Sequence, residues 1–326
     1  MKKLYLVPMV IVILAGLIVG VPGESAAKKI VFRAVSFMPV GFKAVAALGL
    51  YAEEVNKRAK GELEIKWIGG PEVIGPFEQA GAVSGGAMDI TAIPAGFYRS
   101  QLPEAFTLML SRVTPAIERE RGLETFLIDL HRKKMNSYFI GRTNFNYPFF
   151  MATSRPVMNL KDLSGKKAAA SPLTTAFTDA LGMTPIETED EYTAMERGLV
   201  NAVIMPAVQH GDMSMYELET HFIDHGVLSG NVVLLLNWDK WAGLPKHLKD
   251  LMLQARLDLE PKMVALTNKW TMDGRQAARK AGLKIVKFSP KDADAYVDLS
   301  FTSSWENAKP TLSPESYNKM KNFLKK

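Results

Sequence analysis

The segment from Arg155 to Pro206 constrains the fold most, because strand and helix patterns alternate within it at short intervals. An apolar run at Lys167–Ala170 follows a polar connector, and a helix-like stretch covers Leu173–Leu181. Thr184-Pro185 then precedes a second helical stretch, and an apolar strand at Leu199–Ile204 is closed by Pro206. This alternation of short strands and helices is typical of an α/β domain.

The residues before this segment show a similar alternation. Bunched apolar residues predict buried strands, and apolar residues at helical spacing predict the helices between them. A strand–helix–strand–helix–strand order indicates a parallel sheet. The expected elements are a strand at Lys29–Val35, a helix at Phe42–Ala59, a strand at Leu63–Trp67, a short helix at Pro76–Val83 and a strand at Asp89–Ile93.

The remaining elements include one unusually long helix. Helical spacing runs from Lys246 to Ala281, which would span about 54 Å, so the helix would bridge two domains and Pro261 would kink or split it. The other expected elements are an amphipathic helix at Glu118–Lys134, strands at Ser137–Gly141, Pro148–Thr153, Val232–Asn237 and Lys284–Phe288, and a terminal helix at Ser313–Leu324.

These patterns predict two α/β domains with more than one crossing between them. Such an arrangement indicates a hinged clamp around a ligand cleft. We expect residues 28–145 plus about 207–250 to form domain I. We expect residues 146–206 plus about 251–326 to form domain II, with the bridging and C-terminal helices.

The first 27 residues have the layout of a secretory signal peptide. Lys2 and Lys3 precede an apolar run at Leu4–Val21, Pro22-Gly23-Glu24 breaks it, and Ser25-Ala26-Ala27 offers small residues for cleavage. An uncleaved membrane anchor is the alternative, because the run is near the minimum length of a spanning helix. We favour cleavage and export to the periplasm.

Composition and missing motifs exclude several functions. The chain has no cysteine, so disulfides, thiolate metal sites and a cysteine nucleophile are excluded. Its net charge of +6 comes from interspersed charges, not a basic block, so no nucleic-acid partner is expected. Neither phosphate-loop motif occurs, and Gly81–Gly85 does not match a nucleophile elbow. We therefore expect no cofactor and no catalytic residues.

Two polar clusters have structural explanations. Thr188 and Glu191 have the spacing of a capping box at a helix start, which explains the acidic run better than a metal site does. His221 and His225 are four residues apart and could ligate a metal from one helix face. Such a site needs a third ligand, and the intervening residues do not match a metalloprotease motif, so no metal site is expected.

Aromatic and amide residues gather at the expected strand ends. Phe37, Phe97-Tyr98 and Asn144–Tyr147 follow strands, and ligands of α/β domains bind beyond the carboxyl ends of strands. Each aromatic alone is explained better by loop packing, but together they favour a cleft. Trp238 and Trp241 lie at a helix start and are expected to pack.

A series of short sequence steps runs along nearly all of the expected mature chain. In order, they are Gly69-Gly70, Ala87-Met88-Asp89-Ile90, Arg155-Pro156-Val157, Asp162-Leu163-x-Gly165-x-Lys167, Ala180-Leu181-Gly182, Glu191-Tyr192, Gly198-Leu199-Val200-Asn201, Pro206 and Asn237-x-x-x-Trp241-x-x-Leu244-Pro245. In the order and spacing of these steps, the chain resembles the solute receptors of tripartite ATP-independent periplasmic (TRAP) transporters. The resemblance implies two α/β domains, a long helix spanning both, closure around a small organic acid and docking on membrane permease subunits.

Three departures from the family pattern concern the ligand. Ala169 stands where the family places an arginine that pairs bidentately with the ligand carboxylate. Met205 stands where an asparagine contacts the ligand, and Phe149 replaces a second arginine. Since burying a carboxylate without a donor is costly, either another cation replaces the anchor or the ligand is more apolar.

We favour a compact organic acid with a large apolar part, held by backbone donors and Arg142, with Arg99 and Lys43 as other candidate cations. A secreted sensor using the same cleft and, less favoured, a secreted α/β enzyme remain alternatives. The expected ligand-binding residues are Ser36, Phe37, Pro94, Phe97, Tyr98, Arg142, Phe149, Ala169, Ser171, Met205, Gln209 and Asn231.

Overall fold

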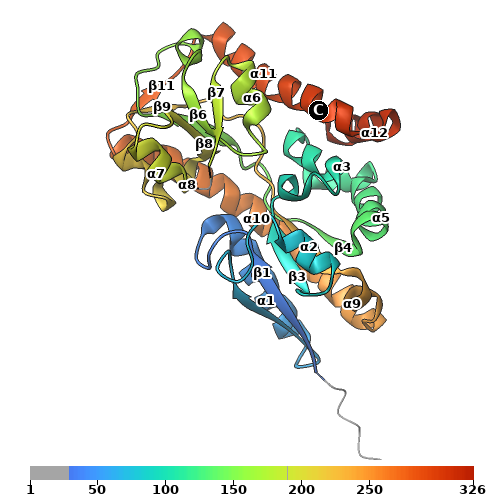
Figure 1. Cartoon of the computed structure of the whole chain (residues 1–326). Coiled ribbons are helices and arrows are strands. Elements are labelled where there is room, and N and C mark those ends of the chain that lie inside the picture. Colours follow the sequence, from blue (N-terminus) through green and yellow to red (C-terminus); the bar gives the residue numbers. More distant parts are fainter. Residues whose placement is uncertain (1–28, 189) are drawn as a thin grey trace, which may run out of the picture.

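The computed structural model describes residues 29–188 and 190–326, so the expected leader lies outside the described residues. Two separate sheets organise them (Figure 1). The first sheet has the order β2-β1-β3-β10-β4, and the second has the order β11-β9-β5-β8-β6-β7. This two-sheet α/β architecture confirms the predicted fold class.

In the first sheet, β1, β2 and β3 are parallel, whereas β10 runs antiparallel to both β3 and β4. Both faces of this sheet are covered. Along β10, Leu234 and Leu236 face a core with α1 and α10, whereas Val233 and Leu235 face a core with α5. The strands are β1 (Ile30–Ser36), β2 (Leu63–Gly69), β3 (Ile90–Ile93), β4 (Ser137–Arg142) and β10 (Val233–Asn237).

The helices around the first sheet are mostly short, and 3-10 turns (η) join several of them. They are η1 (Lys43–Val45), α1 (Ala46–Arg58), α2 (Gln79–Ser84), η2 (Ala95–Tyr98), α3 (Pro103–Phe106), η3 (Thr107–Leu110), α4 (Pro115–Glu120), α5 (Leu123–Met135) and α9 (Trp238–Ala242). Trp241 packs as expected, because its ring stacks on Tyr138 with 3.8 Å between centroids.

The second sheet is mixed, since β5 runs antiparallel to β8 and β9, and β6 runs parallel to β7 and β8. Its strands are β5 (Phe149–Thr153), β6 (Lys167–Ala170), β7 (Thr184–Glu187), β8 (Ala202–Pro206), β9 (His221–Ile223) and β11 (Lys284–Val286). Its short helices are η4 (Leu160–Leu163), α6 (Thr175–Ala180), α7 (Glu191–Glu196), α8 (Ala207–Asp212) and η5 (Met215–Glu217).

Helix α10 (Lys246–Lys280) confirms the predicted long helix. It runs uninterrupted for 35 residues with Pro261 inside it, which corresponds to about 52 Å. Its first half packs on the first sheet through Leu248 and Met252, and its second half packs on α8 at Gly274. Figure 1 shows it running between the two sheets.

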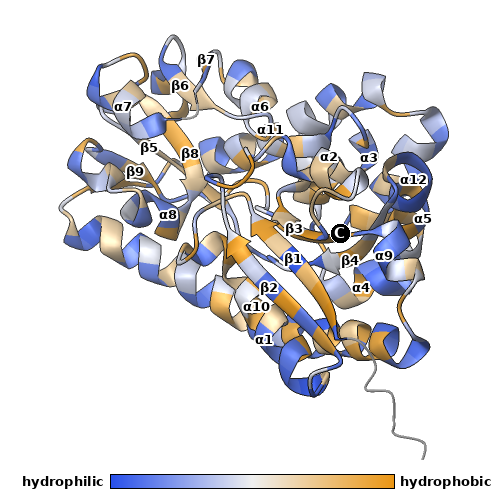
Figure 2. Cartoon of the chain, turned by 60° about the horizontal axis from the view of Figure 1, so that its bottom comes forward, coloured by the Kyte–Doolittle hydropathy of each residue, from blue (hydrophilic) through white to orange (hydrophobic). Residues whose placement is uncertain are grey.

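The C-terminal end of the chain returns to the part of the molecule built around the first sheet, which we call the first half; the part around the second sheet is the second half. Helix α11 (Pro290–Ala308) packs on α6, and η6 (Lys309–Thr311) leads to α12 (Pro314–Leu324), which packs beside α3 (Figure 1). Strands of both sheets carry many of the hydrophobic residues, whereas outer helices such as α12 are largely hydrophilic (Figure 2). No helix within the described ranges is both long and apolar enough to cross a membrane.

Three details differ from the expectations. The single helix predicted at 118–134 is two helices, α4 and α5, because Gly122 between them adopts a left-handed φ of +87°. Helix α11 was not predicted from the sequence. Its buried face has no apolar stripe, because it consists of residues that are mostly small or polar: Tyr296, Ser300, Ser304 and Ala308. Strand β9 lies in the second sheet, although about 207–250 was expected in domain I.

The start of α7 also differs from the expected capping box. The N-cap is Asp190, whose carboxylate accepts a hydrogen bond from the Thr193 N–H. Thr188, two residues before this N-cap, instead accepts from the Asp190 N–H. The polar run thus has the helix-starting role predicted for it, but a different residue supplies the cap.

Candidate functional site

Each sheet turns one row of strand ends toward the other sheet, and we call this row its edge. On the first sheet, the carboxyl ends of β1, β3 and β4 lie at one edge with the start of β10. On the second sheet, the carboxyl ends of β6 and β8 lie beside the start of β5. We call the region between these edges the seam. It is where an α/β clamp binds its ligand.

Several contacts cross the seam and show that the two edges lie close together. Lys43 pairs with Asp212 of α8 at 2.5 Å between Nζ and Oδ1. The Arg99 guanidinium donates to the Pro172 carbonyl at 3.3 Å. A Cβ added at Gly96 would lie 2.2 Å from Leu173 Cδ2, so η2 and this leucine are in close contact.

Aromatic rings gather on the side of the seam formed by the first sheet. Phe97 contacts Phe37 edge-on, with 5.8 Å between ring centroids. Phe77 stacks on the other side of Phe97 at 4.6 Å and stays 42% exposed. Pro94 introduces the turn that carries Phe97. This edge therefore offers ring faces and few polar groups.

The second sheet contributes a mainly apolar edge. Ala169 and Met205 are buried together in one hydrophobic cluster with Met213 beside them. Phe149 is buried in a neighbouring cluster at the start of β5. The Gln209 amide nitrogen contacts two thioethers, Met38 Sδ at 3.8 Å and Met213 Sδ at 3.4 Å, which are weak acceptors.

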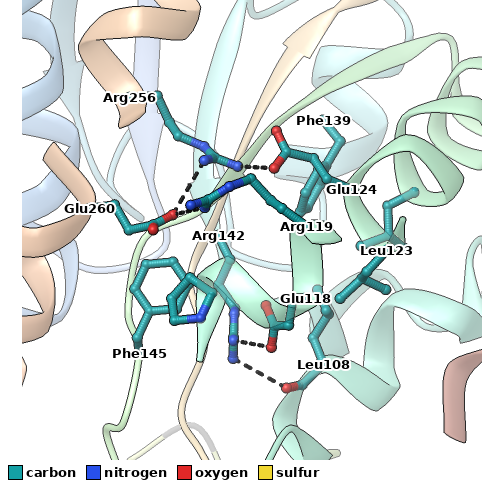
Figure 3. Close-up of a pocket in the computed structure, with 12 residues that line it drawn as sticks. Leu108, Glu118, Arg119, Leu123, Glu124, Phe139, Arg142, Phe145, Arg256 and Glu260 are labelled. Atoms are coloured by element: carbon teal, nitrogen blue, oxygen red, sulfur yellow. Dashed lines mark hydrogen bonds and ion pairs between the residues drawn. The ribbon is translucent and has the colours of Figure 1, made fainter. Parts of the chain in front are cut away.

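Arg142 does not project freely into the seam. Its guanidinium forms a buried ion pair with Glu118, donates to the Leu108 carbonyl at 3.5 Å and lies over the Phe145 ring (Figure 3). The same pocket holds Arg119, Glu124, Arg256 and Glu260, which pair with one another. Because Glu118 already neutralises Arg142, the structure gives this arginine a partner other than a ligand carboxylate.

Three further residues expected at the site are occupied within the protein. Tyr98 is fully buried in the first half, where its hydroxyl contacts His131 Nε2 at 3.0 Å. The Ser36 hydroxyl donates to the Met38 carbonyl and accepts from the Trp67 indole. Ser171 holds the turn before α6 by accepting from the Leu173 N–H. Of these, Ser36 and Ser171 still lie at the strand ends that border the seam.

Two buried uncharged donors at the seam have no partner among the described residues, and neither has the Nε of the buried, ion-paired Arg142. Asn231 accepts from the Ala95 N–H through Oδ1, which leaves its Nδ2 unpaired. The Tyr147 hydroxyl is also unpaired, although only 2% of the residue is exposed. Buried polar groups are rarely left unsatisfied in native proteins, so donors of this kind that also border the seam are candidates to bind a ligand.

The histidine pair does not form a metal site. His221 lies on β9, whereas His225 follows this strand and accepts from the Phe288 N–H at 2.8 Å. Across residues 29–188 and 190–326, no group of three or more His, Asp or Glu side chains is placed to hold a metal ion. The two histidines therefore do not share a helix face, the arrangement that a metal site of this spacing would need.

Three residues at the seam are absent from the ligand-binding residues predicted from the sequence. Asp212 has no local signal, since it pairs with a lysine 169 residues earlier. Leu173 was placed in a helix, but its contact with Gly96 depends on how the two sheets meet. Tyr147 stood among the aromatic and amide residues after β4, yet only burial without a partner distinguishes it from its neighbours.

Comparisons with known proteins agree with this geometry. The model of a family described as bacterial extracellular solute-binding protein, family 7 (DctP), matches residues 38–307. A solute-binding protein of Albidiferax ferrireducens is 19% identical over 271 residues, which cover 79% of each chain.

Two solved structures illustrate the similarity of fold. A TRAP periplasmic solute-binding protein from Desulfovibrio salexigens with bound orotic acid superposes with a TM-score of 0.80, at 18% identity over 90% of this chain and 97% of that one. DctP7 of Bordetella pertussis, an extracytoplasmic solute receptor binding pyroglutamic acid, gives 0.79, at 15% identity over 91% and 99%. At such identities the likeness concerns the fold alone.

Proposed function

This chain belongs to family 7 of the bacterial extracellular solute-binding proteins, and from that premise we propose that it is the periplasmic receptor of a TRAP transporter. It binds a small solute between its two sheets and delivers it to the membrane permease subunits. The observation that supports this proposal is the seam, where strand ends of the two sheets approach each other through contacts such as Lys43–Asp212. Ligands of α/β proteins bind beyond the carboxyl ends of strands.

The ligand in this proposal is a small organic acid with a substantial apolar or aromatic part. Similar proteins bind orotic acid and pyroglutamic acid, which are compact ring acids. The stacked Phe77 and Phe97 rings and the buried Ala169 and Met205 favour an apolar body over a highly hydroxylated one.

Ligand binding then stabilises a closed state that the permease recognises. A ligand shifts such an equilibrium only by its difference in affinity for the two states. Contacts from both sheets to one ligand supply that difference, because opening the seam separates the two sheets' strand ends. A secreted sensor would use the same seam, and it would differ in having a signalling partner instead of a permease.

The test is to express the full chain with its leader, purify the protein from the periplasm and measure its thermal unfolding with a panel of organic acids. Intact mass should show cleavage near Ala27. A true ligand at a hundredfold excess over its Kd stabilises by about 2.7 kcal/mol and should not be consumed. If every acid leaves the melting temperature unchanged, the proposal of an organic-acid ligand is wrong, and if the bound acid is converted, the receptor proposal is wrong.

A further inference from the structure

We propose that the polar end of the ligand is held by two uncharged donors, the Asn231 amide and the Tyr147 hydroxyl. The receptor therefore takes compact, largely apolar compounds that carry at most one negative charge. This inference rests on the proposed function and names the substrate class of the same site. It departs from an arginine-anchored receptor, in which the charge of a carboxylate is itself recognised.

The orientation of the Asn231 amide follows from its one internal hydrogen bond. The Ala95 N–H can only donate, so it must face Oδ1, at 3.2 Å. The Nδ2 group then carries two donors with no acceptor in the described structure, although only 3% of the residue is exposed. Asn231 precedes β10 at the central part of the first sheet, between the ends of β3 and β4.

Tyr147 lies next to this position. The Gly230 N–H donates to the Tyr147 carbonyl at 2.8 Å, so the two backbones adjoin. The Tyr147 ring meets Trp270 of α10 edge-on, with 6.4 Å between centroids. Burial, and secondarily the negative charge of Asp212, raises the pKa of Tyr147, so the hydroxyl keeps its proton and remains a donor.

The charges at the seam are balanced, which is why uncharged donors matter. Lys43 is paired with Asp212, and Arg142 is paired with Glu118. Arg99 has no carboxylate partner among the described residues, but it is exposed at the rim and donates to the Pro172 carbonyl. Within residues 29–188 and 190–326, the buried cation at the seam is Arg142, whose charge Glu118 already balances although its Nε has no partner. A dianion would therefore gain no uncompensated buried cation there, which is unfavourable.

The first experiment compares acids with their amides by titration calorimetry on the protein purified from the periplasm after expression of the full chain. Suitable pairs are phenylacetate with phenylacetamide, pyroglutamate with pyroglutamamide, and orotate with orotamide, and succinate serves as the dianion. We expect the best pair to differ by less than tenfold in Kd, and succinate not to bind. A bidentate arginine would instead favour the acid by about a hundredfold or more.

The second experiment uses two substitutions on the best pair. Tyr147→Phe removes only the hydroxyl and should weaken both members by about five- to tenfold. Asn231→Asp keeps the acceptor for Ala95 but replaces the donor with a negative charge. It should weaken the acid at least tenfold more than the amide, since like charges in a buried site repel.

Tyr296→Phe is the matched control. The Tyr296 hydroxyl is likewise buried and unpaired, but it lies in the core of the second half beside Phe177 and Phe288. This variant should bind like the unchanged protein, and thermal unfolding without ligand should show all three variants folded.

The outcomes separate the inference from the proposed function. Binding with a preference of tenfold or more for the acid, or binding unaffected by Tyr147→Phe, overturns the inference and leaves the receptor function standing. Binding by no compound in either panel contradicts the receptor function, and the inference fails with it.

Discussion

At the scale of single residues, His131 shows how burial fixes a protonation state. It lies on α5 with no exposed surface, and its Nδ1–H donates to the Leu127 carbonyl at 2.7 Å. Its Nε2 must then accept from the Tyr98 hydroxyl. Burial lowers the pKa of His131 to about 4, because the charged form cannot be solvated there.

This shift predicts a loss of stability in acid. An unfolded histidine titrates near pH 6.5, so between about pH 6.5 and 4 the unfolded chain binds a proton that the folded protein does not. Stability is therefore fully present above pH 6.5 and falls as the pH drops toward 4, by about 3 kcal/mol from this residue. Urea unfolding at several pH values measures the slope.

Substitution assigns the slope to this residue. His131→Gln should flatten the pH dependence in that window, leaving the smaller contributions of His221 and His225, whose pKa values burial also lowers. His247→Gln is the control, because His247 is largely exposed. Equal slopes for the unchanged protein and His131→Gln would contradict the assignment.

At the scale of elements, the crossing of α8 and α10 depends on Gly274. A Cβ at this position would lie 2.3 Å from the Ala207 carbonyl carbon and 2.3 Å from the Val208 nitrogen. Backbone atoms cannot move aside as a flexible side chain can, so any larger residue must push the helices apart. The second half of α10 is attached to the second sheet through this contact.

We therefore expect Gly274→Ala to destabilise the protein by about 2 kcal/mol, in the range of overpacked cores, measured by urea unfolding. This is the reverse of the usual effect in helices, where alanine is favoured over glycine by about 0.5–1 kcal/mol. Gly81→Ala in α2 provides the comparison, because nothing lies within 4 Å of its added Cβ. Gly81→Ala should be neutral or stabilising, and a stabilising Gly274→Ala would refute the packing argument.

At the scale of the whole molecule, the Lys43–Asp212 pair links the two halves directly. Its side chains are 38% and 23% exposed, so the attraction is screened and worth under about 1 kcal/mol. Removing it should shift an open–closed equilibrium by no more than about fivefold toward the open state. Distances between spin labels placed on α1 and α7 report this shift without any ligand.

Lys43→Met is the variant for this test, and Lys29→Met is its control. Lys29 pairs with Glu64 at 2.7 Å within the first sheet, at similar exposure, so its loss should leave the distance distribution unchanged. The effect of Lys43→Met should shrink in high salt, where the original pair is screened. Identical distributions for both variants in low salt would show that the pair does not hold the halves together.

The sequence by itself determined the local elements and the class of fold. Alternation of apolar residues marked most strands, helical spacing marked α10 across Pro261, and the order of family motifs identified the receptor family. These signals are local, because side chains repeat every two residues in a strand and every 3.6 in a helix. Elements with small or polar buried faces, such as α11, gave no such signal.

Only the tertiary structure decided which groups at the site are already occupied. Arg142, Tyr98 and Ser36 carry polar groups that suit a ligand, but each has a partner inside the protein. Asn231 is left with a free donor by a contact 136 residues away in the chain. Whether a buried polar group is satisfied depends on which distant segments meet around it, and no local pattern records that meeting.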